Sequence, residues 1–236
     1  MIVSINQPAY LPWPGYFDRI AASDVHVVLD HVQFEKNSFV NRNKVRTPQS
    51  WTWLTVPVRT KGRFGALAIR DLETDTGSGW AQKHLATIKS NYARAPYFAT
   101  LFPELAAIYA NQAATNRFLE PTMAISRWIL ERLGIGTPLV SSSALDLTQR
   151  SSDLVLEICV RLGAKRYLSG PLGRNYLELE KFRASGIEVV FHAYASRPYR
   201  QCWPGFEAGL SSIDMLMNMS TDETLLLMRA GHSVET

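Results

Sequence analysis

The order of the first thirty residues is the feature that most constrains the fold. Residues 2–5 form a short apolar run typical of a buried strand, and a loop with three prolines follows it. Residues 15–22 then have helical spacing, and residues 25–29 form a second buried strand. Strand, helix and strand in this order are the repeating unit of a parallel α/β sheet.

The last third of the chain returns to the same alternation. We expect strands at residues 139–142, 166–168 and 188–192, with helices at residues 152–162 and 176–184 between them. The sequence therefore predicts an α/β fold built on an open, mostly parallel sheet with flanking helices.

The middle of the chain has a different pattern. Period-two alternation at residues 39–46 and 51–58, around a turn at 47–50, predicts an antiparallel hairpin. A loop region up to residue 79 holds one short strand, expected at residues 66–69, and helices are expected at 80–93, 103–112 and 116–133. We expect one domain over residues 1–236, with the hairpin and loop region (about 32–79) and the helical region (about 80–134) inserted between two β/α halves.

Composition sets limits on the class of protein. Hydrophobic residues make up 46% of the chain and charged residues 19%, which excludes a disordered chain. No apolar run reaches the ~18 residues of a membrane span, and the first residues lack the basic and apolar segments of a secretory leader. We therefore expect a cytoplasmic protein. The formal net charge of +4 favours anionic partners without saying which.

Metal and cofactor motifs are not evident. The two cysteines, Cys159 and Cys202, cannot make a four-ligand zinc site, and Asp18, Asp24 and Asp30 straddle a helix and a strand. We therefore predict no metal ligands, and no motif identifies a cofactor or sets the number of copies in an assembly.

The hairpin has the sharpest charge pattern. Alternation puts Arg42, Lys44 and Arg46 on one face of a strand, roughly 7 Å apart, where their repulsion favours binding of a phosphate or a carboxylate. An edge strand that uses cations to prevent association with other sheets is the alternative. Asn41 and Asn43 lie on the opposite face, where burial would require hydrogen-bond partners.

Two loops follow predicted strands at the carboxyl edge, where open α/β sheets bind their ligands. The first loop offers Gln7, Tyr10 and Trp13 as an amide, a phenol and a ring face for a sugar or a base. The second, which begins with Ser169 and Gly170, could receive an anion. An aromatic plug over the core and a plain strand-to-helix turn are the structural alternatives.

Proton transfer near neutral pH favours histidine. His84, on the helix predicted from residue 80, is our candidate base, and Asp30, at the end of the second strand, is the candidate carboxylate. His31, beside Asp30, is a second candidate base, and a purely structural histidine is the alternative for His84. The sequence leaves open whether these three side chains meet.

Segments along nearly the whole chain, taken in order, resemble the WbqC-like family, whose members are often associated with O-antigen and other surface-polysaccharide gene clusters. Members often have a histidine where this chain has Asn6, so a mechanism that uses that histidine as base would not apply here. The segments that carry the resemblance include Gln7-Pro8, Leu11-Pro12-Trp13, Gly15-Tyr16-Phe17, Leu29-Asp30, Asn41-Arg42-Asn43, Lys83-His84, Ser169-Gly170 and Ile213-Asp214.

The resemblance and the residues together favour an enzyme of surface-polysaccharide sugar biosynthesis. It would modify a nucleotide-linked amino sugar, by acyl or aminoacyl transfer, with the phosphorylated small molecule held in one positively charged hollow. Asn41, Asn43 or the Ser169-Gly170 amides could stabilise an oxyanion. A nucleic-acid- or phosphate-binding protein is the second hypothesis, and a non-catalytic assembly partner in a polysaccharide pathway is the third. RNA as the aminoacyl donor would join the first two.

Overall fold

A computed structural model describes residues 1–60, 62, 67–112 and 115–235. Six strands form the main sheet in the order β5-β2-β1-β6-β7-β8, and all neighbours are parallel except β7 and β8. The strands are β1 (Ile2–Asn6), β2 (Val25–Val28), β5 (Leu139–Ser141), β6 (Arg166–Ser169), β7 (Glu188–Tyr194) and β8 (His232–Glu235). The predicted fold class is therefore confirmed.

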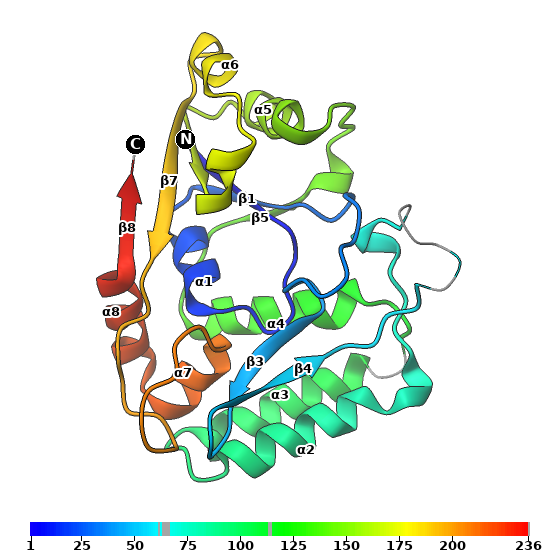
Figure 1. The fold of residues 1–236 in the computed structure, drawn as a ribbon, viewed down its shortest axis with the longest axis vertical. Helices are drawn as coiled ribbons and strands as arrows, with labels where there is room; N and C mark the ends of the chain where they lie inside the picture. The colour runs from blue at the N-terminus through cyan, green and yellow to red at the C-terminus, as the bar shows by residue number, and fades with distance from the viewer. Residues whose placement is uncertain (61, 63–66, 113–114, 236) are drawn as a thin grey trace.

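The second sheet is the predicted antiparallel hairpin, which pairs β3 (Arg42–Arg46) with β4 (Trp51–Thr55). It gathers with α2, α3 and α4 at one end of the molecule, whereas α5 and α6 lie at the opposite end (Figure 1). The helices are α1 (Pro14–Ala21), α2 (Trp80–Tyr92), α3 (Phe98–Gln112), α4 (Leu119–Arg132), α5 (Ser151–Arg161), α6 (Leu179–Ala184), α7 (Ser212–Asn218) and α8 (Thr221–Gly231).

The two faces of the main sheet bury different chemistry. Val3 and Ile5 of β1, Val27 of β2 and Phe191 of β7 join apolar side chains of α5 and α6 in one hydrophobic cluster. The opposite face, toward α1, presents Ser4, His26 and His192, all of them buried. Because strand side chains alternate between faces, this polar layer follows directly from the sequence of each strand.

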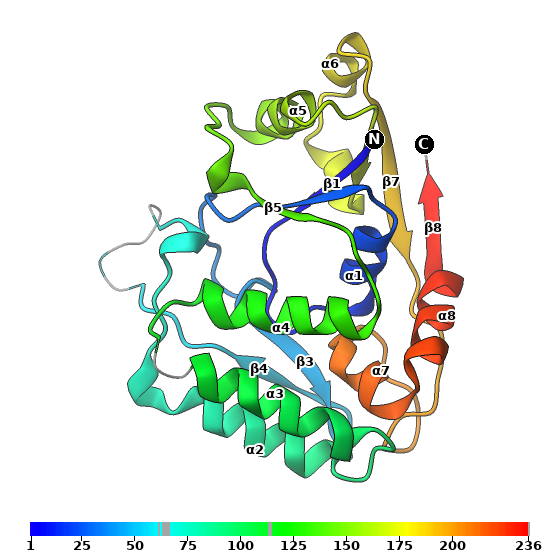
Figure 2. The same ribbon diagram turned by 180° about the vertical axis from the view of Figure 1, so that it is seen from behind.

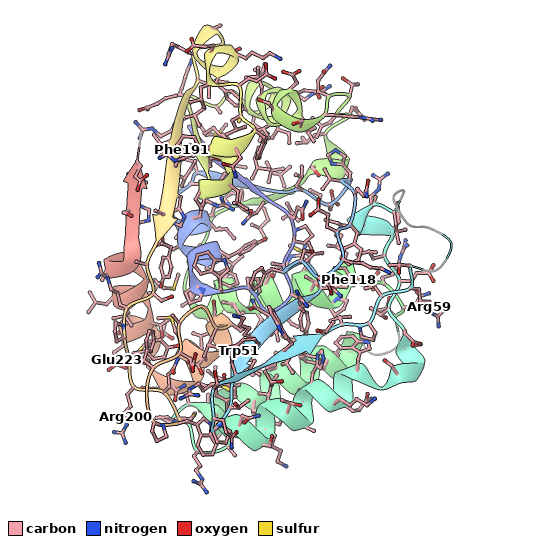
Figure 3. All side chains as sticks on the ribbon, in the orientation of Figure 1. Trp51, Arg59, Phe118, Phe191, Arg200 and Glu223 are labelled. Carbon is pink, nitrogen blue, oxygen red and sulfur yellow. The ribbon has the colours of Figure 1, made fainter. Side chains whose placement is uncertain are left out.

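A second, larger hydrophobic cluster joins the opening loop and α1 to the hairpin and to α2, α3, α4, α7 and α8. Figure 3 shows one aromatic residue of each cluster, Phe191 on β7 and Phe118 just before α4. The opening loop after β1 thus leaves one cluster and enters the other.

The end of the chain adds elements that the periodicity did not predict. Helix α7 is buried on every side, so it has no amphipathic pattern to detect. Helix α8 begins with a capping box between Ser220 and Glu223 and leads straight into β8, which pairs with β7 at the sheet edge (Figures 1 and 2).

Some predicted boundaries also differ. Of the strand expected at residues 66–69, residue 66 lies outside the described residues, Ala68 makes one bridge with Gln33, and Ile69 begins a 3₁₀ turn. Helix α3 begins at Phe98 rather than at residue 103, and it contains Pro103 inside it, whose missing N–H removes one hydrogen bond of the helix. Among the helices that the structure describes, none has both the length and the apolar composition needed to cross a bilayer.

Candidate functional site

The strand order defines a switch point in the main sheet. From β1 the chain passes through α1 to β2 on one side, and from β5 it passes through α5 to β6 on the other side of β1. Connections therefore diverge between the carboxyl ends of β1 and β6, and ligands of open α/β sheets bind in the crevice at such a point. Asn6 ends β1 and is followed by Gln7, and Ser169 ends β6 and is followed by Gly170.

The side chain of Arg19, on α1, extends to the end of β6 at this switch point. A Cβ atom on residue 170 would lie 2.3 Å from Nη1 of Arg19, so only a glycine lets the guanidinium approach the backbone at the end of β6. The Arg19 residue is only 7% exposed. The Gly170 position predicted from the sequence therefore has a cationic partner that the sequence analysis did not identify.

The charge of Arg19 has no anion beside it. Arg19 makes no hydrogen bond and no ion pair with any residue that the structure describes, and the phenols of Tyr167, Tyr16 and Tyr176 are close enough to act on its pKa. Burial lowers the pKa of Arg19, but a guanidinium stays protonated in proteins. A buried cation without a counter-ion is costly, and a bound phosphate or carboxylate would offset that cost.

The middle of the edge holds two side-chain amides. The backbone carbonyl of Asn6 accepts a 2.7 Å hydrogen bond from the Leu29 amide, which continues the pairing of β1 and β2 to their carboxyl ends. Within the described part of the chain, the side chains of Asn6 and Gln7 have no hydrogen-bond partner. Both amides could therefore bind a ligand next to Arg19.

Asp30 and His31 meet at the carboxyl end of β2 through Ser142, which follows β5. The Ser142 hydroxyl donates to Oδ1 of Asp30 at 2.9 Å and lies 2.6 Å from Nδ1 of His31. Ser143 adds a backbone and a hydroxyl donor to the same carboxylate, at 2.9 and 2.7 Å. The carboxylate of Asp30 is thus held by donors from the two residues that follow β5.

This network sets the tautomer of His31. Because the single proton of the Ser142 hydroxyl goes to Asp30, Nδ1 of His31 must donate to the hydroxyl oxygen. Its Nε2 then carries a lone pair, and no described residue hydrogen-bonds to it. Partial burial is the main cause that lowers the pKa of His31, so the ring is neutral at pH 7 and Nε2 can accept a proton.

The His31 group and the Arg19 group belong to the same edge. Strands β2, β1 and β6 are consecutive in the sheet, so two strand spacings, roughly 10 Å, separate the ends of β2 and β6. A phosphorylated sugar is long enough to reach from one group to the other.

His84 lies elsewhere, in the interior. Its Nδ1 is 2.8 Å from the Tyr10 hydroxyl, which also bonds to the hydroxyl of Tyr109. The ring also makes a hydrogen bond with the backbone of Thr55, which uses its other nitrogen. Burial lowers the pKa of His84 to about 4. Asp30, His31 and His84 therefore do not converge: the first two meet, and His84 sits in a closed network.

The opening loop and the hairpin are in contact, but through side chains packed in the core. The Asn43 side chain donates to the Leu11 carbonyl at 2.7 Å, and that of Asn41 donates to the Val56 carbonyl at 2.9 Å. Tyr10 and Asn43 are fully buried. The amide NH₂ groups of the two asparagines therefore donate to backbone carbonyls of the fold, and Trp13 packs its ring against Tyr194.

The three hairpin cations have separate environments. Arg46 is 2% exposed and donates to the carbonyls of Thr47, Ser50 and Pro204. Arg42 lies over the ring of Trp53, and Lys44 lies over that of Trp51, at 4.3 and 4.1 Å from the ring centroids. We call Arg42, Lys44, Trp51 and Trp53 the aromatic-cationic face of the hairpin; Figure 3 labels Trp51.

A further polar cluster joins three distant segments. Oδ2 of Asp18, on α1, is 2.6 Å from Nε2 of His192 and 2.7 Å from Nδ1 of His232. The three ligand atoms all lie within 4.8 Å of one another, as in a metal site. Sequence spacing could not reveal this group, because the members are 174 and 214 residues apart.

A small hollow extends the carboxyl edge beyond β7. It lies where the chain leaves β7 and passes the start of α1, and its lining includes Pro14, Tyr194, Arg197, Tyr199, Phe206 and Leu210. Concave surface and unpaired polar groups thus both occur at this edge of the sheet.

Comparison with known proteins agrees with the resemblance seen in the sequence. The model of the WbqC-like protein family matches residues 7–225. The uncharacterized protein Rv1507c of Mycobacterium tuberculosis is 36% identical over 221 residues, which cover 93% of this chain and 94% of that protein. No solved structure matches the chain. The chain therefore belongs to the WbqC-like protein family.

Proposed function

We propose that this protein is an enzyme that binds a nucleotide-linked amino sugar at the carboxyl edge of its sheet and transfers an acyl or aminoacyl group to it. The observation that carries the proposal is Arg19, a buried guanidinium without an anionic partner among the described residues, placed at the switch point between β1 and β6. The diphosphate of the substrate would bind there, and the association of the family with polysaccharide gene clusters supports the sugar.

The neighbouring groups fit the rest of such a substrate. The amides of Asn6 and Gln7 would hydrogen-bond to sugar hydroxyls beside the phosphate. His31, roughly 10 Å away along the edge, would face the amino group of the sugar. Asp30 and Ser142 act as positioning residues, because they hold the Nδ1–H tautomer of His31.

The proposed reaction is an acyl transfer. The sugar amine attacks the carbonyl carbon of an activated acyl or aminoacyl ester, the new C–N bond forms, and the C–O bond of the donor breaks. Nε2 of His31 takes the proton that the amine loses, and returns it to the departing alkoxide of the donor. The reaction needs no oxidant and no reductant.

The first experiment measures thermal stabilisation by UDP-N-acetylglucosamine and by inorganic pyrophosphate. At a ligand concentration of ~100 times Kd, binding to the folded state alone adds about 2.7 kcal/mol to the unfolding free energy. The Arg19→Met variant should lose this response, and Arg127→Gln, which removes an exposed arginine of α4, should keep it. Without ligand, Arg19→Met should be as stable as the original chain or more so, since it removes an uncompensated buried charge.

Two results would count against the proposal. One is that neither ligand stabilises the original chain, and the other is that Arg19→Met responds as strongly as Arg127→Gln. UDP-N-acetylglucosamine serves as a binding probe only, because its nitrogen is already acylated. A His31→Gln variant that binds it but has lost acyl transfer to a nucleotide sugar with a free amino group would support the assigned base.

The aromatic-cationic face of the hairpin favours a second candidate function, which is binding of single-stranded nucleic acid. Aromatic rings stack on bases and cations pair with phosphates, and Trp51 is 38% exposed beside Lys44. Such binding should weaken steeply with salt, and Arg42→Ala should reduce both the affinity and the salt dependence. If Arg42→Ala instead abolishes stabilisation by the sugar nucleotide, this face belongs to the substrate site.

A further inference from the structure

We infer that Asp18, His192 and His232 form a site for a divalent transition-metal ion. The three side chains come from α1, from β7 and from the first residue of β8, and they point at one another from three elements that are distant in sequence. The site uses none of the groups that we assign to the sugar nucleotide, and so the inference goes beyond the proposed function.

The charge of Asp18 is the first argument. Asp18 is 5% exposed, and among the described residues its only ion-pair partners are the two imidazoles. Arg19, next in sequence, points instead toward Gly170. A buried carboxylate is costly unless a cation compensates it. A divalent ion between the three groups would supply the full compensation.

The donor set is the second argument. Two imidazoles and one carboxylate form the ligand set of many catalytic zinc sites, and of the facial triad that binds Fe²⁺. Three protein ligands leave at least one coordination position for water or another ligand. Oδ1 of Asp18 makes no hydrogen bond with any described residue, so the carboxylate has a second oxygen available.

The distances require only a small adjustment. Ligand atoms bound at ~2.0–2.1 Å around a tetrahedral ion are roughly 3.3 Å apart. The carboxylate oxygen now lies 2.6 and 2.7 Å from the two ring nitrogens, so each of these distances would lengthen by less than about 1 Å, and the two nitrogens already lie within 4.8 Å of each other. The His232 side chain is 30% exposed and sits at the start of an edge strand, which gives it the freedom to move and gives the ion a path from solvent.

The ion would connect the two ends of the chain. Helix α1 lies near the N-terminus, and β8 is the last strand, which among the described strands pairs with β7 alone (Figure 1). A metal bound to all three side chains would fasten β8 and α8 to α1. Metal binding to the folded state also raises stability by mass action.

The test uses the full chain, treated with a chelator and then titrated with Zn²⁺ alone by calorimetry, and with Co²⁺ as a spectroscopic probe. We expect one ion per chain. The His232→Gln variant should bind at least about tenfold more weakly, since loss of a direct ligand costs more than loss of an outer-shell partner. The matched control is His31→Gln, because both variants keep four of the five histidines.

The Co²⁺ spectrum separates this site from the cysteines. Coordination by nitrogen and oxygen lacks the intense thiolate charge-transfer bands that Cys159 or Cys202 would produce. Asp18→Asn is a second variant, which keeps the shape of the side chain and removes its charge, and it should also lose the ion. Circular dichroism should show that each variant is folded.

The outcomes distinguish the alternatives. Loss of binding in His232→Gln and Asp18→Asn, with binding kept in His31→Gln, supports the inference. If the chelator-treated original chain binds no Zn²⁺, or if His232→Gln binds as tightly as His31→Gln, Asp18 is only a hydrogen-bond acceptor for two imidazoles and the inference is wrong. None of these results depends on whether a sugar nucleotide binds.

Discussion

The interior of the larger hydrophobic cluster and the carboxyl edge of the sheet each hold a histidine bonded to a hydroxyl, but the two networks differ. In the interior, Tyr10 and the Thr55 backbone use both nitrogens of His84. At the edge, Ser142 uses only Nδ1 of His31, and Nε2 has no partner among the described residues. A closed network stabilises the fold, whereas an open one leaves a lone pair for chemistry.

The same contrast holds for the two arginines that lie deepest. Arg46 is buried with three backbone carbonyls as acceptors, and Arg19 is buried with none within the part of the chain that the structure describes. Burial alone therefore does not indicate whether a charged residue serves the fold or a ligand. The count of hydrogen bonds already made by each nitrogen separates the two roles.

The largest expected effect is on stability. His84→Ala removes a buried ring with both of its hydrogen bonds, and we expect it to lower the unfolding free energy by about 4 kcal/mol. His31→Ala removes a half-buried ring with one bond, and we expect a loss of about 1 kcal/mol or less. Denaturant unfolding of the two variants measures the difference, and equal losses would break the comparison.

The next effect is the response to acid. The folded-state pKa of His84 is about 4 and the unfolded value is 6.5, so the unfolded chain takes up the proton first as the pH falls. The contribution of His84 to stability is therefore complete above pH 6.5 and is lost between pH 6.5 and about 4. The loss amounts to about 3 kcal/mol.

Unfolding free energies measured across this pH range test the response. Burial lowers the pKa of His26 to about 3, in the same direction, so the original chain contains both contributions. The His84→Gln variant should therefore keep part of the acid dependence and lose the part that belongs to His84. An unchanged pH profile in His84→Gln would show that the ring is accessible to protons in the folded state.

The smallest effect concerns the edge histidine. The negative charge of Asp30 raises the pKa of His31 against the larger, opposing effect of burial, and Arg70 lowers it. Asp30→Asn should therefore lower the pKa of His31 further, as NMR titration of the ring would show. Asp24→Asn is the control, since its carboxylate accepts from the Ile2 amide at the opposite end of the strands. A rise in the His31 pKa in Asp30→Asn would contradict the network described here.

Several parts of the site could be predicted from sequence. Gln7, Asp30 and Gly170 each follow a strand with clear apolar periodicity, and parallel strands place such residues at one edge. The partners of these residues could not be predicted. Ser142 is 112 residues from Asp30, and no local pattern indicates which loop ends beside which.

Arg19 illustrates the same limit. Helical spacing correctly predicts α1, but a helix of this length normally leaves one face exposed to solvent. All residues from Pro14 to Ile20 are buried in the structure, so Asp18 and Arg19 are enclosed together with their apolar neighbours. The helix is enclosed because α8 and β7 pack against it and cover the face that would otherwise contact solvent.

The amino-acid sequence by itself determined the class of fold, the hairpin and the positions that end each strand, because periodicity and turn residues act over a few neighbours. The tertiary structure alone decided which histidine keeps a lone pair, which arginine lacks a counter-ion, and which carboxylate meets two imidazoles. Those properties depend on groups brought together from more than a hundred residues apart, whose burial and hydrogen bonds exist only after the chain has packed.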